Sequence, residues 1–121
     1  MVVRLPNESQ TDRLFFALSD ATRRDIVSQT LDRKRSVSEL GRLYPISLTA
    51  IQKHVEVLVD AGLVSKQRSG REQLVSGEVD QLRRAHKLLE ELERVWRARL
   101  DRFADVVYET TKHETTTKEN K

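Results

Sequence analysis

The chain contains no cysteine, and this absence removes several kinds of site at once. Disulfide bonds and metal sites built from thiolates are excluded, and the composition suits a reducing cytosol. Long hydrophobic runs are also missing, because no segment approaches the roughly 18 apolar residues of a membrane span. The start, MVVRLPNESQ, lacks the apolar stretch of a signal peptide. We therefore expect a soluble, cytoplasmic protein without a membrane partner.

Charge of one sign is not in large excess either. The 121 residues include 22 Lys and Arg against 19 Asp and Glu, a formal net charge of +3. Net charge alone is therefore a weak indication of nucleic-acid binding. With 37% apolar and 34% charged residues, the chain is polar for a free-standing globule. This balance suits a small helical domain whose apolar surface is completed by a partner subunit.

Apolar spacing predicts two helices at the start of the domain. Leu14 and Leu18 recur at helical spacing within a first helix, over residues 10–19. Asp20 is a good N-cap for a second helix, whose first turn carries Arg23 and Arg24. Cations in a first turn oppose the helix dipole. We therefore expect these arginines to have partners outside the helix, either acidic core residues or a phosphate.

The next segment has the pattern of a helix-turn-helix. Ser36 and Glu39 form the capping box of a short helix that Pro45 ends. Ser47 caps a second helix, over residues 47–61, and Gly62 ends it. The apolar stripe of this second helix is expected to face inward and consists of Leu48, Ile51, Val55 and Leu58. Two capped helices joined by a tight turn indicate a helix-turn-helix unit.

A hairpin and one long helix complete the prediction. Residues 63–68 and 72–75 flank a Ser69-Gly70 turn and predict a β-hairpin, or wing. A long helix with an apolar stripe follows, from about residue 78 to 108. The fold class is therefore mainly α with a small β-hairpin: a winged helix-turn-helix domain with a long C-terminal helix for dimerisation. The domain is expected to span 10–109, between a flexible lead-in, 1–9, and a disordered polar tail, 110–121.

The helix at 47–61 carries polar residues that suit base recognition. Thr49, Ala50, Gln52 and Lys53 face outward near its N-terminus if its apolar stripe faces inward. In helix-turn-helix proteins this part of the second helix enters the major groove. Gln can pair with adenine there, and Lys can donate to guanine. Ser47 and the free N–H groups of the first turn suit a phosphate. The alternative for Gln52 and Lys53 is an ordinary solvated face.

The wing and one histidine add candidate contacts. Arg68 and Arg71 flank the wing tip, where they can reach a phosphate or the minor groove. The alternative is a hairpin turn, within 68–72, that merely carries charge. His54 lies at the edge of the apolar stripe and can contact a phosphate or support the helix from behind. Between these two roles we favour the DNA contact.

Three segments resemble the ArsR/SmtB family of winged-helix repressors, most closely its metal-independent members. These are LFFALSDATRRDIV, SVSELGRLYPISLTAIQKHVEVLVDAGLVSKQRSGREQLV and WRARLDRF, within residues 12–104. The resemblance implies a homodimeric transcription regulator, usually a repressor of a near-palindromic operator and sometimes of its own gene, without a cofactor. It implies double-stranded DNA as a partner and DNA contacts at Ser47, Thr49, Ala50, Gln52, Lys53, His54, Arg68 and Arg71. Ala21, Gln73 and Val75 depart from the family pattern.

The long helix is the natural dimer element, because its apolar stripe is too extended for one small domain to cover. In the resembled family the first and last helices pair across a two-fold axis. This implies a dimer interface at Leu14, Phe15, Leu89, Leu92, Trp96 and Phe103. The alternative is a long helix that packs entirely on its own domain.

Other functions have weaker support in the sequence. His86 and Glu90 share a helix face, but two ligands on a charged helix indicate an ion pair rather than a metal site. No Gly-rich phosphate loop or nucleophile motif is present, so we do not expect an enzyme. The main alternative is a protein–protein adaptor that keeps the winged-helix fold without reading DNA. The sequence indicates no particular effector.

Overall fold

The computed structural model describes residues 8–119, with side chains described for 9–112. Residues 1–7 of the predicted lead-in, 1–9, lie outside the described residues, and so do residues 120–121. The chain divides into two units between Ala85 and His86, and each unit is described by itself.

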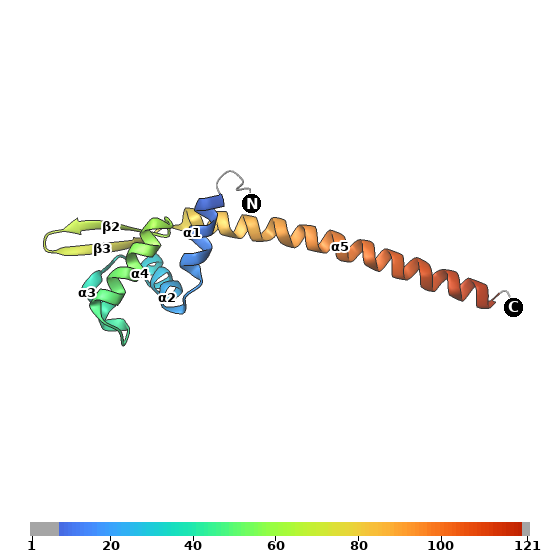
Figure 1. The fold of residues 1–121 in the computed structure, drawn as a ribbon, viewed down its shortest axis with the longest axis horizontal. Coiled ribbons are helices and arrows are strands. Elements are labelled where there is room, and N and C mark those ends of the chain that lie inside the picture. The colour runs from blue at the N-terminus through green and yellow to red at the C-terminus, as the bar shows by residue number, and fades with distance from the viewer. Residues whose placement is uncertain (1–7, 120–121) are drawn as a thin grey trace, which may run out of the picture. The chain divides into compact units, whose positions relative to one another are not determined.

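Residues 8–119 form five helices and three strands (Figure 1). In chain order these are α1 (Glu8–Leu18), α2 (Ala21–Asp32), β1 (Arg35–Ser36), α3 (Val37–Leu43), α4 (Leu48–Asp60), β2 (Val64–Ser69), β3 (Glu72–Gly77) and α5 (Val79–Glu119). This order confirms the predicted fold class, a mainly helical winged helix-turn-helix with a long C-terminal helix.

Capping side chains set the helix starts, as the sequence predicted. The Asp20 carboxylate accepts a hydrogen bond from the Arg23 backbone N–H at 3.0 Å, at the start of α2. Ser36 and Glu39 form the complete capping box of α3. Ser47 Oγ accepts from the Ala50 N–H at 3.1 Å, at the start of α4. Each bond satisfies an N–H group that has no partner within the helix.

The end of α4 follows from its glycine. Gly62 has φ +73°, a left-handed conformation that is costly for other residues. The Gly62 N–H donates to the Val59 carbonyl, and the Leu63 N–H donates to the Leu58 carbonyl, both at 2.9 Å. These two bonds form a Schellman motif, which ends the helix and turns the chain into β2.

The wing belongs to a three-stranded antiparallel sheet with the order β1-β3-β2. The sequence did not predict β1, whose Arg35 pairs with Val75 of β3. The hairpin loop consists of Gly70 and Arg71, because Ser69 pairs with Glu72. The turn therefore lies one residue later than predicted. Gly70 has φ +62°, which suits the tight turns that join twisted strands.

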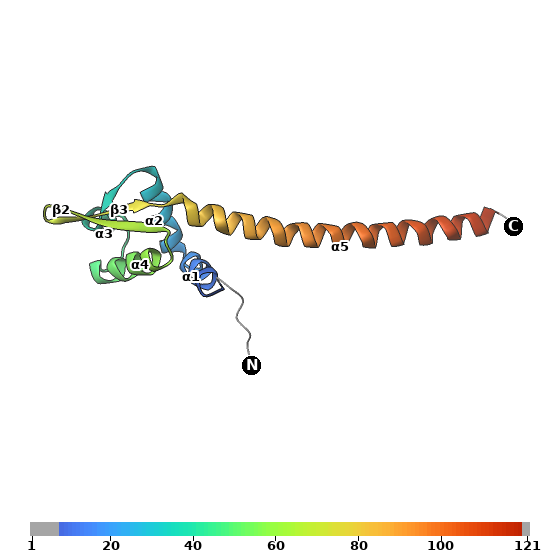
Figure 2. The same cartoon turned by 90° about the horizontal axis from the view of Figure 1, so that it is seen from above.

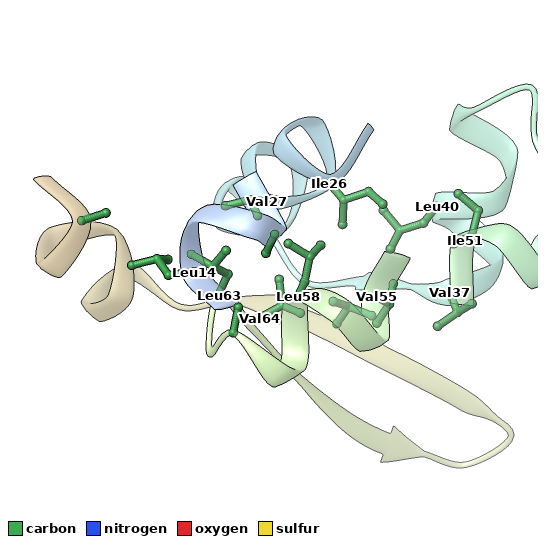
Figure 3. Packing of buried hydrophobic residues seen from close by; sticks show 14 residues of the cluster. Leu14, Ile26, Val27, Val37, Leu40, Ile51, Val55, Leu58, Leu63 and Val64 are labelled. Atoms are coloured by element: carbon green, nitrogen blue, oxygen red, sulfur yellow. The ribbon is translucent and has the colours of Figure 1, made fainter. Parts of the chain in front are cut away.

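The core of the first unit lies among α1 to α4 and the sheet (Figure 3). Ile51, Val55 and Leu58 of α4 are buried there, as the helical stripe predicted. Leu48, the first residue of that stripe, was predicted to face inward but is 49% exposed. It occupies the first turn of α4, beyond the edge of the core, and lies beside Gly41 of α3. The inward stripe of α4 therefore begins at Ile51.

The prediction for α1 also needs a correction. Leu14, predicted to lie in the dimer interface, is only 1% exposed and packs within its own core with Ala17. Phe15 is half-buried against that core, whereas Phe16 is an exposed residue. Residues 14 and 16 lie about 200° apart around a helix, so a helix that buries Leu14 presents Phe16 outward.

The last helix is longer than predicted. α5 is one continuous helix to Glu119 (Figure 2), whereas the sequence pattern ended it near Tyr108 and predicted a disordered tail at 110–121. The hydroxyl of Thr110 donates to the Val106 carbonyl at 2.9 Å. This bond within the helix is one way in which a threonine is accommodated in an α-helix.

Candidate nucleic-acid interface

The N-terminal half of α4 presents the predicted polar residues to solvent. Ser47, Thr49, Gln52 and Lys53 are exposed, and Ala50 is half-buried. Among the described residues, the side chains of Thr49, Gln52 and Lys53 form no hydrogen bond or ion pair within the chain. The first turn of α4 carries no acidic residue that would offset the positive end of its dipole. These side chains are therefore free to bind an external partner.

A shallow groove joins α4 to the wing. Gln52 of α4 and Gln73 of β3 line it along its length, with Val37 of α3. Towards the wing tip the lining includes Arg68, Arg71 and Glu72, and towards the base of the sheet it includes Lys66 and Glu56. The groove thus brings together residues of α4 and of the wing, which the sequence predicted separately.

The strand register explains which wing cations face this groove. Val64, Lys66 and Arg68 alternate along β2, so their side chains project from one face of the hairpin. Val64 is buried, which identifies this face as the one toward the core. Lys66 and Arg68 continue the same face beyond the core, toward α4. Lys66 was not among the predicted contacts, although strand alternation with Arg68 could have identified it.

A buried arginine supports α4 from behind. Arg23 of α2 is 8% exposed, and its Nε and Nη2 donate to the Ala17 and Phe16 carbonyls, each at 2.9 Å. Its guanidinium carbon lies 5.1 Å from the centre of the Phe16 ring. These carbonyls end α1 and carry the negative end of its dipole, which a cation stabilises.

Arg23 and Arg24 were expected to have acidic or phosphate partners. Instead, both arginines donate to backbone carbonyls of the preceding helix. Arg23 binds the carbonyls of Phe16 and Ala17, and Arg24 Nη1 donates to the Leu18 carbonyl at 2.8 Å. Both arginines therefore cap the C-terminus of α1. This pairing depends on the sharp turn at Ser19, which brings the start of α2 back to the end of α1.

His54 extends this support to α4. Its Nδ1 lies 3.3 Å from Arg23 Nη1 and 4.0 Å from Asp20 Oδ2, and its side chain is 22% exposed. Because arginine can only donate, the shorter contact makes Nδ1 an acceptor and places the proton of the neutral ring on Nε2. The supporting role considered for His54 is therefore present in the structure. The DNA contact predicted for His54 would use the other ring nitrogen, Nε2, and it stays a prediction.

Three of the described side chains have shifted pKa values. Those of Asp20 and Glu39, at helix starts, are lowered, and that of Tyr44, in a tertiary contact, is raised. The Arg23 backbone N–H, helped by the nearby His54, holds the pKa of Asp20 below its ordinary value. The Arg33 guanidinium lowers the pKa of Glu39, which it contacts at 2.9 Å. Burial and a hydrogen bond to Asp25 raise the pKa of Tyr44 well above its ordinary value.

The described residues contain no group of three or more His, Cys, Asp or Glu side chains placed to hold a metal ion. The pair considered from the sequence lies on α5, where His86 Nε2 is 3.4 Å from Glu90 Oε1. Two such side chains on an exposed helix form an ion pair when the histidine is protonated. Among the same residues, no helix is long and apolar enough to cross a membrane.

The helix-turn-helix of α3 and α4, with the β2–β3 wing beside it, defines a winged helix-turn-helix protein. Residues 18–67 match the family model of a helix-turn-helix domain. The chain is 32% identical over 96 residues to the HTH-type transcriptional regulator Rv2034 of Mycobacterium tuberculosis, covering 79% of this chain and 87% of that protein. It is 45% identical over 67 residues to the uncharacterized HTH-type transcriptional regulator YuzN of Bacillus subtilis, covering 50% of this chain and 73% of that protein.

Solved structures give the same assignment. An ArsR-like transcriptional regulator from Rhodococcus sp. RHA1 superposes with a TM-score of 0.77 at 28% identity, over 87% of this chain and 96% of that chain. A second solved structure, described as an ArsR family transcriptional regulator, has a TM-score of 0.70 at 26% identity. The match covers 79% of this chain and 97% of that chain. The chain belongs to the ArsR family of DNA-binding transcriptional regulators and is not an enzyme.

Proposed function

We propose that this chain is a homodimeric repressor, active in the cytoplasm, that binds a near-palindromic operator and can control its own gene. In this proposal α4 enters the major groove of each half-site, and the 68–72 wing lies on the backbone or in the minor groove. Two reading helices about one DNA turn apart enlarge the recognised sequence and the number of neutralised phosphates.

The observation that carries the proposal is the unpaired polar surface of α4 beside the cationic wing. Thr49, Gln52 and Lys53 are exposed on a capped helix without partners among the described residues, and Gln52 shares a groove with Arg68 and Arg71. Base edges offer partners for the amide and ammonium groups, and phosphates offer partners for the guanidinium groups. Ser47, Ala50 and His54 complete the proposed contact set.

The proposed dimer surface uses exposed apolar residues. Leu89, Leu92, Trp96 and Phe103 of α5 are all more than half exposed. On α1, half-buried Phe15 and exposed Phe16 are the residues available to a second copy. We further propose that repression is independent of metal, because no thiolate ligand is available and His86 and Glu90 supply only two side chains.

Fluorescence anisotropy on the DNA upstream of the chain's own gene tests DNA reading. We expect the unmodified protein to prefer this duplex over a scrambled one, with an affinity that falls steeply as salt rises. The double variant Gln52→Ala with Lys53→Ala should lose most of the preference, because each good base contact contributes about 1–3 kcal/mol of discrimination. Sedimentation should show that the double variant keeps the oligomeric state of the parent.

Lys87→Ala is the matched control, since it removes one exposed cation from α5 rather than from α4. Its binding should resemble that of the unmodified protein. If neither duplex is bound even at low salt, the repressor proposal fails and the adaptor function takes its place. If both duplexes are bound equally well, the upstream region does not contain the operator, and selection from a random duplex pool identifies it.

A further inference from the structure

Leu48 is an accessible apolar residue on a polar surface. It is the first residue of α4, is 49% exposed, and lines the groove between α4 and the wing. Most of the lining near the wing tip is polar or charged, and its other apolar residue, Val37, is buried. Leu48 therefore lies on the surface that the proposed function assigns to DNA, and the role inferred for it rests on that function.

Two neighbours fix the position of Leu48. Ser47 caps the helix, because its Oγ accepts from the Ala50 N–H and its carbonyl accepts from the Ile51 N–H, each at 3.1 Å. On α3, a Cβ atom at Gly41 would lie 3.2 Å from Leu48 Cδ1, so the leucine can approach the α3 backbone because residue 41 has no side chain. One side of Leu48 is thus held against α3, and the rest of its side chain is open to a partner.

Leu48 and Gln52 lie on the same side of α4. Residues four apart in a helix differ by about 40° in direction and by about 6 Å along the axis. Both line the groove, and Leu48 is nearer the N-terminus, which is the part of α4 that enters the major groove in the proposed function. Because base pairs are about 3.4 Å apart, Leu48 should meet a base within one or two pairs of the base that Gln52 contacts.

The major groove offers one apolar group to such a side chain. Base edges there present hydrogen-bond donors and acceptors, together with the 5-methyl group of thymine. A leucine side chain can neither donate nor accept, so against a polar edge it would displace water without replacing the lost hydrogen bond. Against a thymine methyl group both surfaces are apolar, and their contact removes both from water.

We propose that Leu48 is a specificity-determining residue that contacts the 5-methyl group of a thymine in each half-site. Gln52 and Leu48 then read A·T pairs in two ways, because the amide binds the edge of adenine and the leucine contacts the methyl group of thymine. Cytosine lacks this methyl group and carries an amino group at the neighbouring ring position. Leu48 therefore selects thymine over cytosine.

The alternative is that Leu48 only packs on α3. Leu43 and Ile46, in and beside the α3–α4 turn, are also exposed, at 47% and 38%, and an exposed apolar residue is not by itself a sign of binding. These two residues lie outside the described lining of the groove. The two roles of Leu48 differ in one measurable respect, since packing on α3 does not depend on a methyl group in the DNA.

Uracil in place of thymine removes the methyl group and keeps the base pairing. The duplex that the unmodified protein prefers, from the upstream region or from the random pool, is prepared with thymine and, separately, with uracil at every thymine position. Fluorescence anisotropy measures the affinity of the full chain for each duplex, and the first affinity divided by the second is the methyl ratio. One lost methyl contact should weaken binding roughly fourfold, so two half-sites should give a methyl ratio above about ten.

Substitutions assign the methyl ratio to one side chain. Leu48→Ala should lower the ratio roughly tenfold, because the affinity of this variant no longer depends on the methyl groups. Leu48→Met keeps a long apolar side chain and should retain most of the ratio. Leu43→Ala shortens an exposed leucine outside the groove lining, and Thr49→Ser removes a methyl group from the next residue of α4. Both controls should leave the ratio unchanged, and urea denaturation reports whether each variant keeps its fold.

The outcomes separate the methyl contact from DNA reading itself. A methyl ratio that falls in Leu48→Ala and persists in Leu48→Met supports the contact. A ratio near one in the unmodified protein, or a ratio that Leu48→Ala leaves unchanged, overturns the contact, while a retained preference over the scrambled duplex leaves the proposed function standing. A ratio that falls in Thr49→Ser but not in Leu48→Ala also overturns it and assigns the methyl group to Thr49. A protein that prefers no duplex overturns both proposals.

Discussion

Arg23 of α2 and His54 of α4 lie 3.3 Å apart, between Nη1 and Nδ1, and so link the end of the first helix to the proposed reading helix. Arg23 binds the last carbonyls of α1 with its other nitrogens. One buried side chain therefore holds three helices together, although a cation in a first turn opposes the dipole of its own helix. Its removal should affect the position of α4 as well as the stability of α1.

We expect Arg23→Met to lower the free energy of unfolding by about 2–3 kcal/mol. Methionine keeps the apolar stem but leaves the Phe16 and Ala17 carbonyls without their charged donor. Arg24→Met is the matched control, because Arg24 is exposed and makes a single bond to Leu18. It should cost less than about 1 kcal/mol. Urea denaturation measures both, and equal losses would contradict a special role for Arg23.

The same contact predicts the tautomer of His54. Because Arg23 donates to Nδ1, the neutral ring should carry its proton on Nε2. Nitrogen-15 NMR in alkaline buffer should show an unprotonated Nδ1 and a protonated Nε2 for this residue. Arg23→Met should shift His54 toward a mixture of tautomers and leave the exposed His86 unchanged. A proton found on Nδ1 in the unmodified protein would exclude the hydrogen bond.

Local signals made much of this fold predictable. Asp20, Ser36 and Ser47 each bond to an N–H three residues away, so sequence spacing alone identifies them as caps. The stripe of α4 and Gly62 depend on contacts within a few turns and were predicted for the same reason. At the candidate nucleic-acid interface, the exposed positions of Gln52 and Lys53 follow from the helical periodicity of α4.

Non-local features were not predictable in the same way. β1 contains two residues, and it is a strand only because Arg35 and Ser36 pair with β3 about forty positions later in the chain. The partners of Arg23 depend on how α1 and α2 pack. Leu48 continues the α4 stripe in sequence but is exposed because the core ends before it. Periodicity describes the face of a helix and does not show how far the core extends along it.

Wing cations should contribute to affinity through phosphates. We expect Arg68→Ala and Arg71→Ala each to reduce the slope of log affinity against log salt by about 1. Because phosphate contacts carry no base information, binding to specific and scrambled duplexes should weaken by similar factors. Anisotropy titrations over a salt series measure both quantities, and Lys87→Ala should leave the slope unchanged. A loss confined to the specific duplex would instead indicate a base contact by the wing.

The cap of α2 predicts a dependence of stability on acid pH. The Arg23 N–H lowers the pKa of Asp20 below its ordinary value of 3.8 in the folded protein. The carboxylate therefore contributes stability that is present above that ordinary value and is lost as pH falls through the lower, folded-state pKa. Asp20→Ala should cost about 1 kcal/mol at neutral pH through loss of the cap.

Asp20→Asn separates the charge from the cap. Asparagine is also a good N-cap, so this variant should stay close to the unmodified protein at neutral pH. It should lack the part of the acid-induced loss that belongs to Asp20. Denaturant titrations at neutral and acid pH compare the three proteins. An Asn variant with the same acid profile as the parent would show that other carboxylates account for the whole dependence.

Gly77 predicts a close contact between the wing sheet and α2. A Cβ atom at this position would lie 2.7 Å from the backbone nitrogen of Leu31 and 2.7 Å from its Cγ. Backbone atoms cannot move aside as a flexible side chain can, so Gly77→Ala requires β3 to shift relative to α2. We expect the substitution to lower the free energy of unfolding by about 1–3 kcal/mol.

Gly70→Ala tests a different property and serves as the comparison. A Cβ there has no neighbour within 4 Å, and the only penalty comes from φ +62°, about 1–2 kcal/mol. Shortening the neighbour with Leu31→Ala should therefore recover part of the loss at Gly77 and none of the loss at Gly70. The recovery should be incomplete, because the Leu31 nitrogen remains in place. Additive losses for Gly77→Ala and Leu31→Ala in a double-mutant cycle would show that the two residues do not touch.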